Sequence, residues 1–200
     1  RLEERLTESR GTETTFFAFG NTVAALNYKK PYECHGWMGV RFQLRPGSAT
    51  HDSILHVRML DRDNSLQQEA IGFFGVNLIY GAFHFRDAPD AFIKSLADNV
   101  GHGRIEVDMI EFNGPDFENV DNRILSLKLV EAGLTEAVMF DQNGRVEQPA
   151  ETLYKKSCLI ERGSLRPLTK VNVDMLEKAQ AQFIKREDVD SNHVKVFIKL

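Results

Sequence analysis

The run IEVDMIEF-NGPDFENVDN-RILSLKLVEAG-L-TEAVMF, residues 105–140, gives the clearest indication of the fold. Apolar and polar residues alternate through 105–112, which is typical of a strand. Residues 123–133 carry apolar side chains at helical spacing and end on glycine, and 135–140 is a second apolar run. This order predicts a β-α-β unit with parallel strands. We therefore expect an α/β fold of three layers, with a mixed, mostly parallel sheet flanked by helices.

Patterns on either side of this unit predict the other elements. Residues 37–44 and 54–60 predict an antiparallel pair of strands. The apolar run 70–83, capped by Asn64 or Ser65, is apolar around nearly its whole circumference, which predicts a helix buried between layers. Further predicted elements are helices at 1–9, 90–100 and 173–185 (capped by Asn172), a hairpin turn at 141–144, and strands at 157–161 and 194–200.

The composition is that of an ordinary globular domain. Of the 200 residues, 42% are hydrophobic and 27% are charged, which excludes a disordered chain and a coiled-coil rod. Lys and Arg number 25 against 29 Asp and Glu, a net charge of −4, so we expect no nucleic-acid and no membrane partner.

Cysteine content and chain organisation bear on the compartment and on the number of domains. Cys34 and Cys158 are too few for a disulfide framework, which favours the cytoplasm. Without a repeat or a linker-like run, we expect residues 1–200 to form a single α/β domain. The strand-like run 194–200 at the end predicts that this domain is the amino-terminal part of a longer protein.

Four stretches carry a resemblance to a known family: HVRMLD (56–61), GVNLIYGAF (75–83), VDMIEFNGPDFENVDNRILSL (107–127) and RGSLRPLTKVNVDML (162–176). Over about residues 16–183 the chain resembles a bacterial family of unestablished function, found in cyanobacteria and proteobacteria. Its members bear the name nicotinate-nucleotide adenylyltransferase or TonB-dependent receptor. They are longer than this chain, so the resemblance also implies an amino-terminal part.

Neither family name is supported by the residues. An outer-membrane receptor needs many strands of about ten alternating residues, whereas this sequence is rich in predicted helices. A nucleotidyltransferase of the adenylyltransferase kind carries an H-x-G-H or T-x-G-H motif after its first strand. The nearest string here, VGHGR at 100–104, has one histidine and precedes a strand.

The loop 113–122 is the first candidate site. Ligands of open α/β sheets bind outside the carboxyl ends of strands, and this loop leaves such an end and enters a helix whose free N–H groups could meet an anion. It brings Asp116, Asp121, Asn122 and Arg123 together. The alternative is structural: Asp121 caps the helix, and Arg123 pairs with Asp116 or Glu118. Asp121 is also a candidate for orienting a metal-bound phosphate or a water.

A second candidate is the basic stretch 155–170, in which Arg162 and Arg166 flank a flexible glycine. Guanidinium groups in such a loop suit a phosphate or a carboxylate. The alternative is a solvated charged face, or a contact with a missing part of the protein.

Three further sets of polar residues have structural alternatives. Cys34 and His35 are adjacent but point to opposite faces of an extended chain, and without metal-ligand spacing we expect no metal site. His56 and Arg58 share one face of a strand that Asp61 ends, as a possible cluster or as a polar outer face. Asn77 and His84 lie seven residues apart on one face of the apolar helix, where buried polar groups are usually just hydrogen-bonded.

Two functions follow as expectations. The first is binding of a nucleotide or another phosphate-bearing ligand, with a site built from the loop 113–123 and the basic stretch. The second is a non-catalytic interaction or regulatory domain that docks on its own carboxyl-terminal half or on a second copy. The residues identify neither a catalytic group nor a cofactor.

Overall fold

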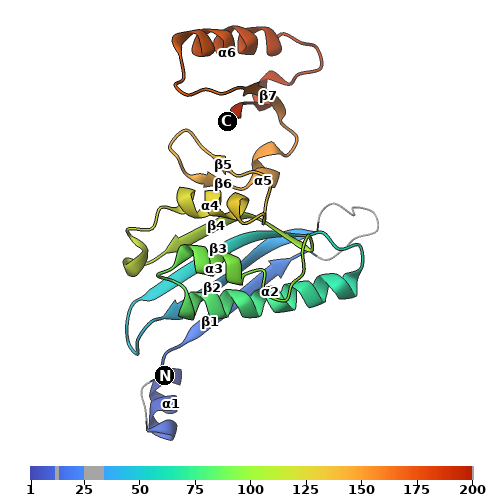
Figure 1. Cartoon of the computed structure of the whole chain (residues 1–200). Coiled ribbons are helices and arrows are strands. Elements are labelled where there is room, and N and C mark those ends of the chain that lie inside the picture. Colours follow the sequence, from blue (N-terminus) through green and yellow to red (C-terminus); the bar gives the residue numbers. More distant parts are fainter. Residues whose placement is uncertain (12–13, 25–33, 200) are drawn as a thin grey trace. The chain divides into compact units, whose positions relative to one another are not determined.

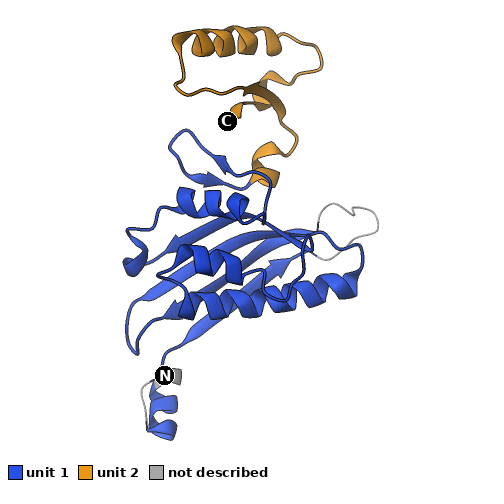
Figure 2. Ribbon diagram, viewed as in Figure 1, with its two compact units in different colours: residues 1–148 blue, residues 149–200 orange. Residues whose placement is uncertain are grey.

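The structure is a computed structural model that describes residues 1–11, 14–24 and 34–199. The chain divides into two compact units, residues 1–148 and 149–200 (Figure 2).

The first unit is built on a four-stranded antiparallel sheet (Figure 1). Its strands are β1 (Phe17–Val23), β2 (His35–Gln43), β3 (Thr50–Met59) and β4 (Ile105–Asn113), hydrogen-bonded in the order β1-β2-β3-β4. The predicted antiparallel pair of strands at 37–44 and 54–60 is confirmed as β2 and β3. Strand β2 alternates buried and more exposed side chains along its whole length, and one face of the sheet supplies the core.

The predicted fold class is wrong, because β4 pairs antiparallel with β3 and not parallel with a later strand. Residues 135–140 contribute only the two-residue strand β5 (Met139–Phe140), which forms a hairpin with β6 (Val146–Glu147). The turn at 141–144 is confirmed, since the Gly144 N–H donates to the Asp141 carbonyl at 2.9 Å. A short apolar run therefore marks a hairpin here and not the second strand of a β-α-β unit.

Three helices pack with the sheet around one hydrophobic core: α2 (Asn64–His84), α3 (Pro89–Ser95) and α4 (Asn122–Glu131). The core joins alternate side chains of β2, β3 and β4 to one side of each helix, for example Leu55 with Leu78 and Leu125. A short helix, η1 (Pro115–Phe117), follows β4, and α1 (Leu2–Arg10) forms at the predicted polar helix.

Helix α2 is half exposed, which corrects the prediction that it is buried between layers. Leu78 is fully buried, whereas Val76, two residues earlier, is 65% exposed. The exposed side carries an apolar stripe at helical spacing, and its N-terminal cap is Asp63 rather than Asn64 or Ser65. The stripe consists of Leu66, Phe73, Val76 and Tyr80.

The second unit contains the parallel pair of the chain's described strands. Strands β7 (Ser157–Arg162) and β8 (Val194–Lys199) pair in parallel, with α6 (Lys170–Phe183) between them in sequence. Helix α6 begins three residues before the predicted start, because Thr169 and Asn172 form a capping box. Two short helices, α5 (Pro149–Leu153) and η2 (Ser191–His193), complete this unit, and Leu200 lies outside the described residues.

Candidate functional site

Polar side chains gather on the sheet face that points away from the core, called here the outer face. Because side chains alternate along a strand, Leu55 and Val57 enter the core while His56 and Arg58 project to the outer face. The antiparallel register sets Trp37 opposite His56 and His35 opposite Arg58. The predicted shared face of His56 and Arg58 is therefore confirmed.

His56 stands at the centre of a buried hydrogen-bonded chain. Its Nδ1 atom lies 2.6 Å from Oδ1 of Asp108, and its Nε2 atom lies 3.0 Å from Nδ1 of His35. The amide nitrogen of Gln148 lies 3.2 and 3.4 Å from the two ring nitrogens, and Trp37 packs edge-on against the ring. His56 and Asp108 are 1% and 4% exposed, so this chain is screened from water on all but the His35 side.

A β-bulge positions Asp108 for this contact. The pairing of β3 with β4 shifts between His56 and Val57, which face Met109 and Val107, so Asp108 is the extra residue. After the bulge the alternation is reversed, and Ile110 and Phe112 enter the same core as Val107. The alternation in the sequence over residues 105–112 predicts that Ile110 lies on the same face as Asp108. This prediction is wrong because the bulge reverses the alternation.

A second, more exposed set of hydrogen bonds continues along the outer face. The Arg58 guanidinium donates to one Glu106 oxygen at 2.8 Å, and the Thr135 hydroxyl donates to the other at 3.0 Å. Only one Arg58 nitrogen takes part in this pairing with Glu106, and its side chain is 41% exposed, so the guanidinium also faces solvent. Asp61, considered as a possible member of a cluster with His56 and Arg58, pairs instead with Arg104 at 2.8 Å.

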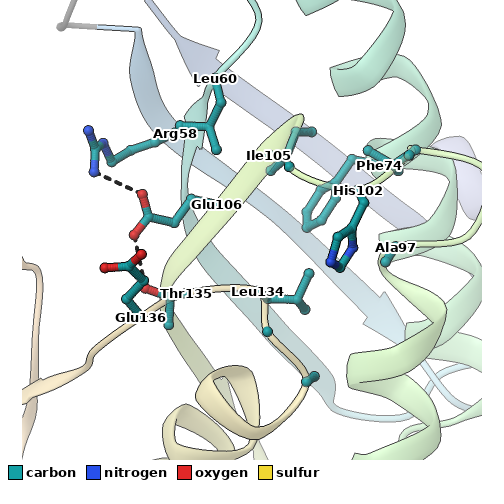
Figure 3. Close-up of a pocket in the computed structure, with 15 residues that line it drawn as sticks. Arg58, Leu60, Phe74, Ala97, His102, Ile105, Glu106, Leu134, Thr135 and Glu136 are labelled. Atoms are coloured by element: carbon teal, nitrogen blue, oxygen red, sulfur yellow. Dashed lines mark hydrogen bonds and ion pairs between the residues drawn. The ribbon is translucent and has the colours of Figure 1, made fainter.

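A pocket of about 430 Å³ opens beside the start of β4 (Figure 3). Its walls come from β4, from the turn 97–103 and from residues 132–136, which run next to β4 because the Val107 N–H donates to the Leu134 carbonyl at 2.9 Å. One wall is polar and the other is mainly apolar. The polar wall consists of Arg58, Glu106, Thr135 and Glu136, and the opposite side carries Phe74, Ala97, Ile105 and Leu134 together with the ring of His102.

In the predicted loop site, Asp121 and Arg123 bind each other. Asp121 caps α4 by accepting from the Arg123 N–H at 2.9 Å, and the Arg123 guanidinium donates to both Asp121 oxygens at 3.0 and 2.6 Å. The guanidinium hydrogen bond, followed by the backbone one, lowers the pKa of Asp121 to about 2. Asp121 caps the helix as the structural alternative predicts, but Arg123 pairs with Asp121 itself and not with Asp116 or Glu118.

Asn122 and Asp116 are also held by neighbouring groups. The Asn122 amide accepts from the Phe112 N–H at 2.8 Å and donates to the Phe112 carbonyl at 3.1 Å, which ties the start of α4 to the end of β4. Nε2 of the buried His51 accepts from the Asp116 N–H at 3.2 Å. The loop residues thus lie close together, as expected, but each has a protein partner.

The remaining predicted residues lie elsewhere. Arg162 and Arg166 belong to the second unit, and a site that joins them to the loop stays a prediction. Cys34 is buried and followed by His35 on the opposite face, as predicted. Asn77 donates to the carbonyls of Leu96 and Asp98 at 3.0 and 2.7 Å, the structural role considered for it. Over residues 1–11, 14–24 and 34–199, no three His, Cys, Asp or Glu side chains form a group that could hold a metal ion.

Sequence reasoning missed Asp108, Glu106 and Gln148 as partners of the outer face. An available signal was the pair of acidic residues at 106 and 108 in an otherwise apolar strand, since buried carboxylates need a partner. Gln148 carried no such signal, because its contact with His56 spans 92 residues of sequence.

Comparison of the chain with family models, with curated proteins and with solved structures returned no match. Among the described residues, no helix is both long enough and apolar enough to cross a membrane.

Proposed function

We propose that the first unit binds a small molecule in the pocket beside β4, and that the ligand has an apolar body and a neutral or cationic hydrogen-bond-donating end. The observation that supports this most is the division of the pocket into an apolar wall and a polar wall. A volume of about 430 Å³ lies in the range of small-molecule sites, which runs from about 300 to 1,000 Å³.

The charges of the polar wall favour a donor end. Glu106 is held by Arg58 and Thr135, which fixes its carboxylate without a ligand. Glu136 adds a second carboxylate, so the wall carries two negative charges against one positive charge. A carboxylate or phosphate group next to this wall meets net repulsion, whereas an amine or a hydroxyl group can donate to it.

The alternative ligand is the phosphate-bearing compound expected from the sequence, bound either in this pocket or at the loop 113–123. It would agree with the family name of a nicotinate-nucleotide enzyme. Its support is weaker in the loop, because Asp121 already occupies the Arg123 guanidinium. Cytoplasmic location also remains a proposal, supported by the small number of cysteines.

The experiment compares four probes. Benzylamine, benzyl alcohol and benzoate share an apolar ring and differ in the charge of the polar end, which is positive, neutral and negative in turn. Adenosine monophosphate represents the phosphate-bearing ligands. Binding is followed by backbone NMR shifts and by the melting temperature, which a ligand of the folded state raises. We expect benzylamine and benzyl alcohol to shift residues 97–105 and 132–136, and benzoate to bind more weakly.

Three variants identify the site. Ala97→Phe fills the pocket and should abolish the shifts, and Glu136→Gln should weaken benzylamine while sparing benzyl alcohol. Glu118→Gln, an exposed glutamate outside the pocket, is the matched control. Absence of binding by all four probes, or binding that Ala97→Phe leaves intact, contradicts the proposal; preference for adenosine monophosphate supports the phosphate alternative instead.

A second candidate function, an interaction domain that pairs with another copy of itself, is favoured by the apolar stripe of α2. Val76 is 65% and Tyr80 52% exposed, and such surfaces mark contacts when they are contiguous. Analytical ultracentrifugation tests it: a dimer that Tyr80→Lys dissociates supports pairing through α2, and a monomer at all concentrations contradicts it.

A further inference from the structure

The hydrogen-bonded chain Asp108–His56–His35 fixes where its protons lie. A carboxylate only accepts hydrogen bonds, so the His56 Nδ1 atom, 2.6 Å from Asp108, carries the hydrogen. In a neutral imidazole the other nitrogen is then an acceptor, and the His35 Nδ1 atom, 3.0 Å away, must donate to it. Both rings are thus Nδ1–H tautomers, which leaves the Nε2 atom of His35 with a lone pair.

We propose that His35 Nε2 is a proton-accepting site for the hydroxyl group of a small ligand or for a water molecule. The O–H bond breaks, its electron pair stays on the oxygen, and the proton bonds to His35 Nε2. The Nδ1 proton of His35 then passes to His56 Nε2. The positive charge therefore rests on His56, against the Asp108 carboxylate, and not on the more exposed ring.

Burial strengthens the contact between His56 and Asp108 that receives the charge. His56 and Asp108 are almost completely buried, so their attraction after proton uptake acts in a medium of low polarity. His35 is only partly buried and provides the access. His56 and Asp108 act here as positioning residues, because they work through His35.

The surroundings of His35 suggest the kind of ligand. Arg58 lies directly opposite His35 in the strand register, and opposed residues on one face have Cβ atoms about 5 Å apart. Two further charged groups lie near His35 and His56 in the strand register on the outer face. They are Arg58 and its hydrogen-bond partner Glu106. The exposed guanidinium of Arg58 can hold the oxygen that loses its proton, which suits hydroxyl compounds whose anion is small and compact.

The proposed site shares Arg58 with the pocket, but Ala97→Phe and Glu136→Gln change the pocket and leave Arg58 and the hydrogen-bonded residues Asp108, His56 and His35 unaltered. A failure of the proposed pocket function can therefore be separated from a failure of this inference.

The first test is imidazole ¹⁵N NMR of the unmodified chain above neutral pH. We expect the Nδ1–H tautomer for both His35 and His56. Observation of His35 as the Nε2–H tautomer, or of His56 with both nitrogens protonated throughout, overturns the proposal.

The second test measures reactivity with diethyl pyrocarbonate, which carbethoxylates an imidazole nitrogen that bears a lone pair. His84 and His102, both exposed, serve as internal controls in peptide mass spectrometry. We expect His35 to react severalfold faster than its exposure alone predicts, and Asp108→Asn to remove that excess without changing His102. Equal reaction rates of His35 in the unmodified protein and in Asp108→Asn overturn the proposal. If Asp108→Asn fails to fold, the tautomer measurement still tests the proposal, because it needs no variant.

Discussion

The Nδ1 atom of His56 lies 2.6 Å from Oδ1 of Asp108, although 52 residues separate the two in the chain. Asp108→Asn replaces a buried charged hydrogen bond with a neutral one, and we expect it to lower the free energy of unfolding by about 1–3 kcal/mol. Urea denaturation measures this change. Asp52→Asn is the matched control, because Asp52 pairs with the exposed Arg41, where the loss should stay below about 1 kcal/mol. Equal losses for the two variants would contradict the buried role of Asp108.

Alanine substitutions at Gly114 and Gly103 distinguish the stability cost of backbone strain from that of steric conflict. Both have a positive φ, of 135° and 70°, but a Cβ at Gly114 would lie 2.8 Å from the His51 ring and 3.0 Å from its Cα, whereas Gly103 has open space. We expect Gly103→Ala to cost about 1–2 kcal/mol from conformation alone. Gly114→Ala should cost clearly more in the same thermal unfolding measurement; a smaller cost than at Gly103 would show that the β4–η1 loop adapts.

The pKa of Asp121 is held at about 2, below its usual 3.8, chiefly by the Arg123 guanidinium. Because the folded state lowers this pKa, the contribution to stability is present above pH about 3.8 and is lost as the pH falls toward about 2. Arg123→Gln should raise the pKa toward 3.8, as carboxyl ¹³C NMR can measure. The pKa of Asp63, lowered mainly by the Ser65 hydroxyl, should not change and is the control.

The two sides of α2 should respond very differently to truncation. Leu78→Ala removes a fully buried side chain and should cost about 2–5 kcal/mol. Val76→Ala, on the side where the residue is 65% exposed, should change stability by less than about 0.5 kcal/mol. A large cost at Val76, measured by urea denaturation, would mean that the apolar stripe is covered in solution.

The sequence predicts most helices and strands of this protein and the pairing of β2 with β3, but not the partner of β4. The run 105–112 has the alternation of a strand, and it is one, yet its partner is β3 and not the segment at 135–140. Local patterns indicate whether a residue is extended, whereas the choice of partner depends on packing over the whole sheet. The hairpin at 141–144 was predictable because its turn is specified by adjacent residues, Asn143 and Gly144.

The candidate site shows the same limit. Strand periodicity alone predicts that His56 and Arg58 share a face, as they do. The carboxylates that complete the cluster, Asp108 and Glu106, come from a distant strand, and the bulge at Asp108 is not visible in the residue pattern. The loop residues Asp121 and Arg123 were identified as neighbours, but two residues so close in sequence can neutralise each other without any ligand.

Gln148, whose amide lies against the ring of His56, is also the last residue of the first unit. Mechanical tension applied to the chain beyond Gln148 would thus act directly on the Gln148 side chain, which covers the buried imidazole of His56. Cleavage on the amino-terminal side of Gln148 would uncover the ring, while cleavage on its carboxyl-terminal side would leave the cover attached. Gln148 is therefore the last residue that a shortened chain must retain to keep the dry environment of His56.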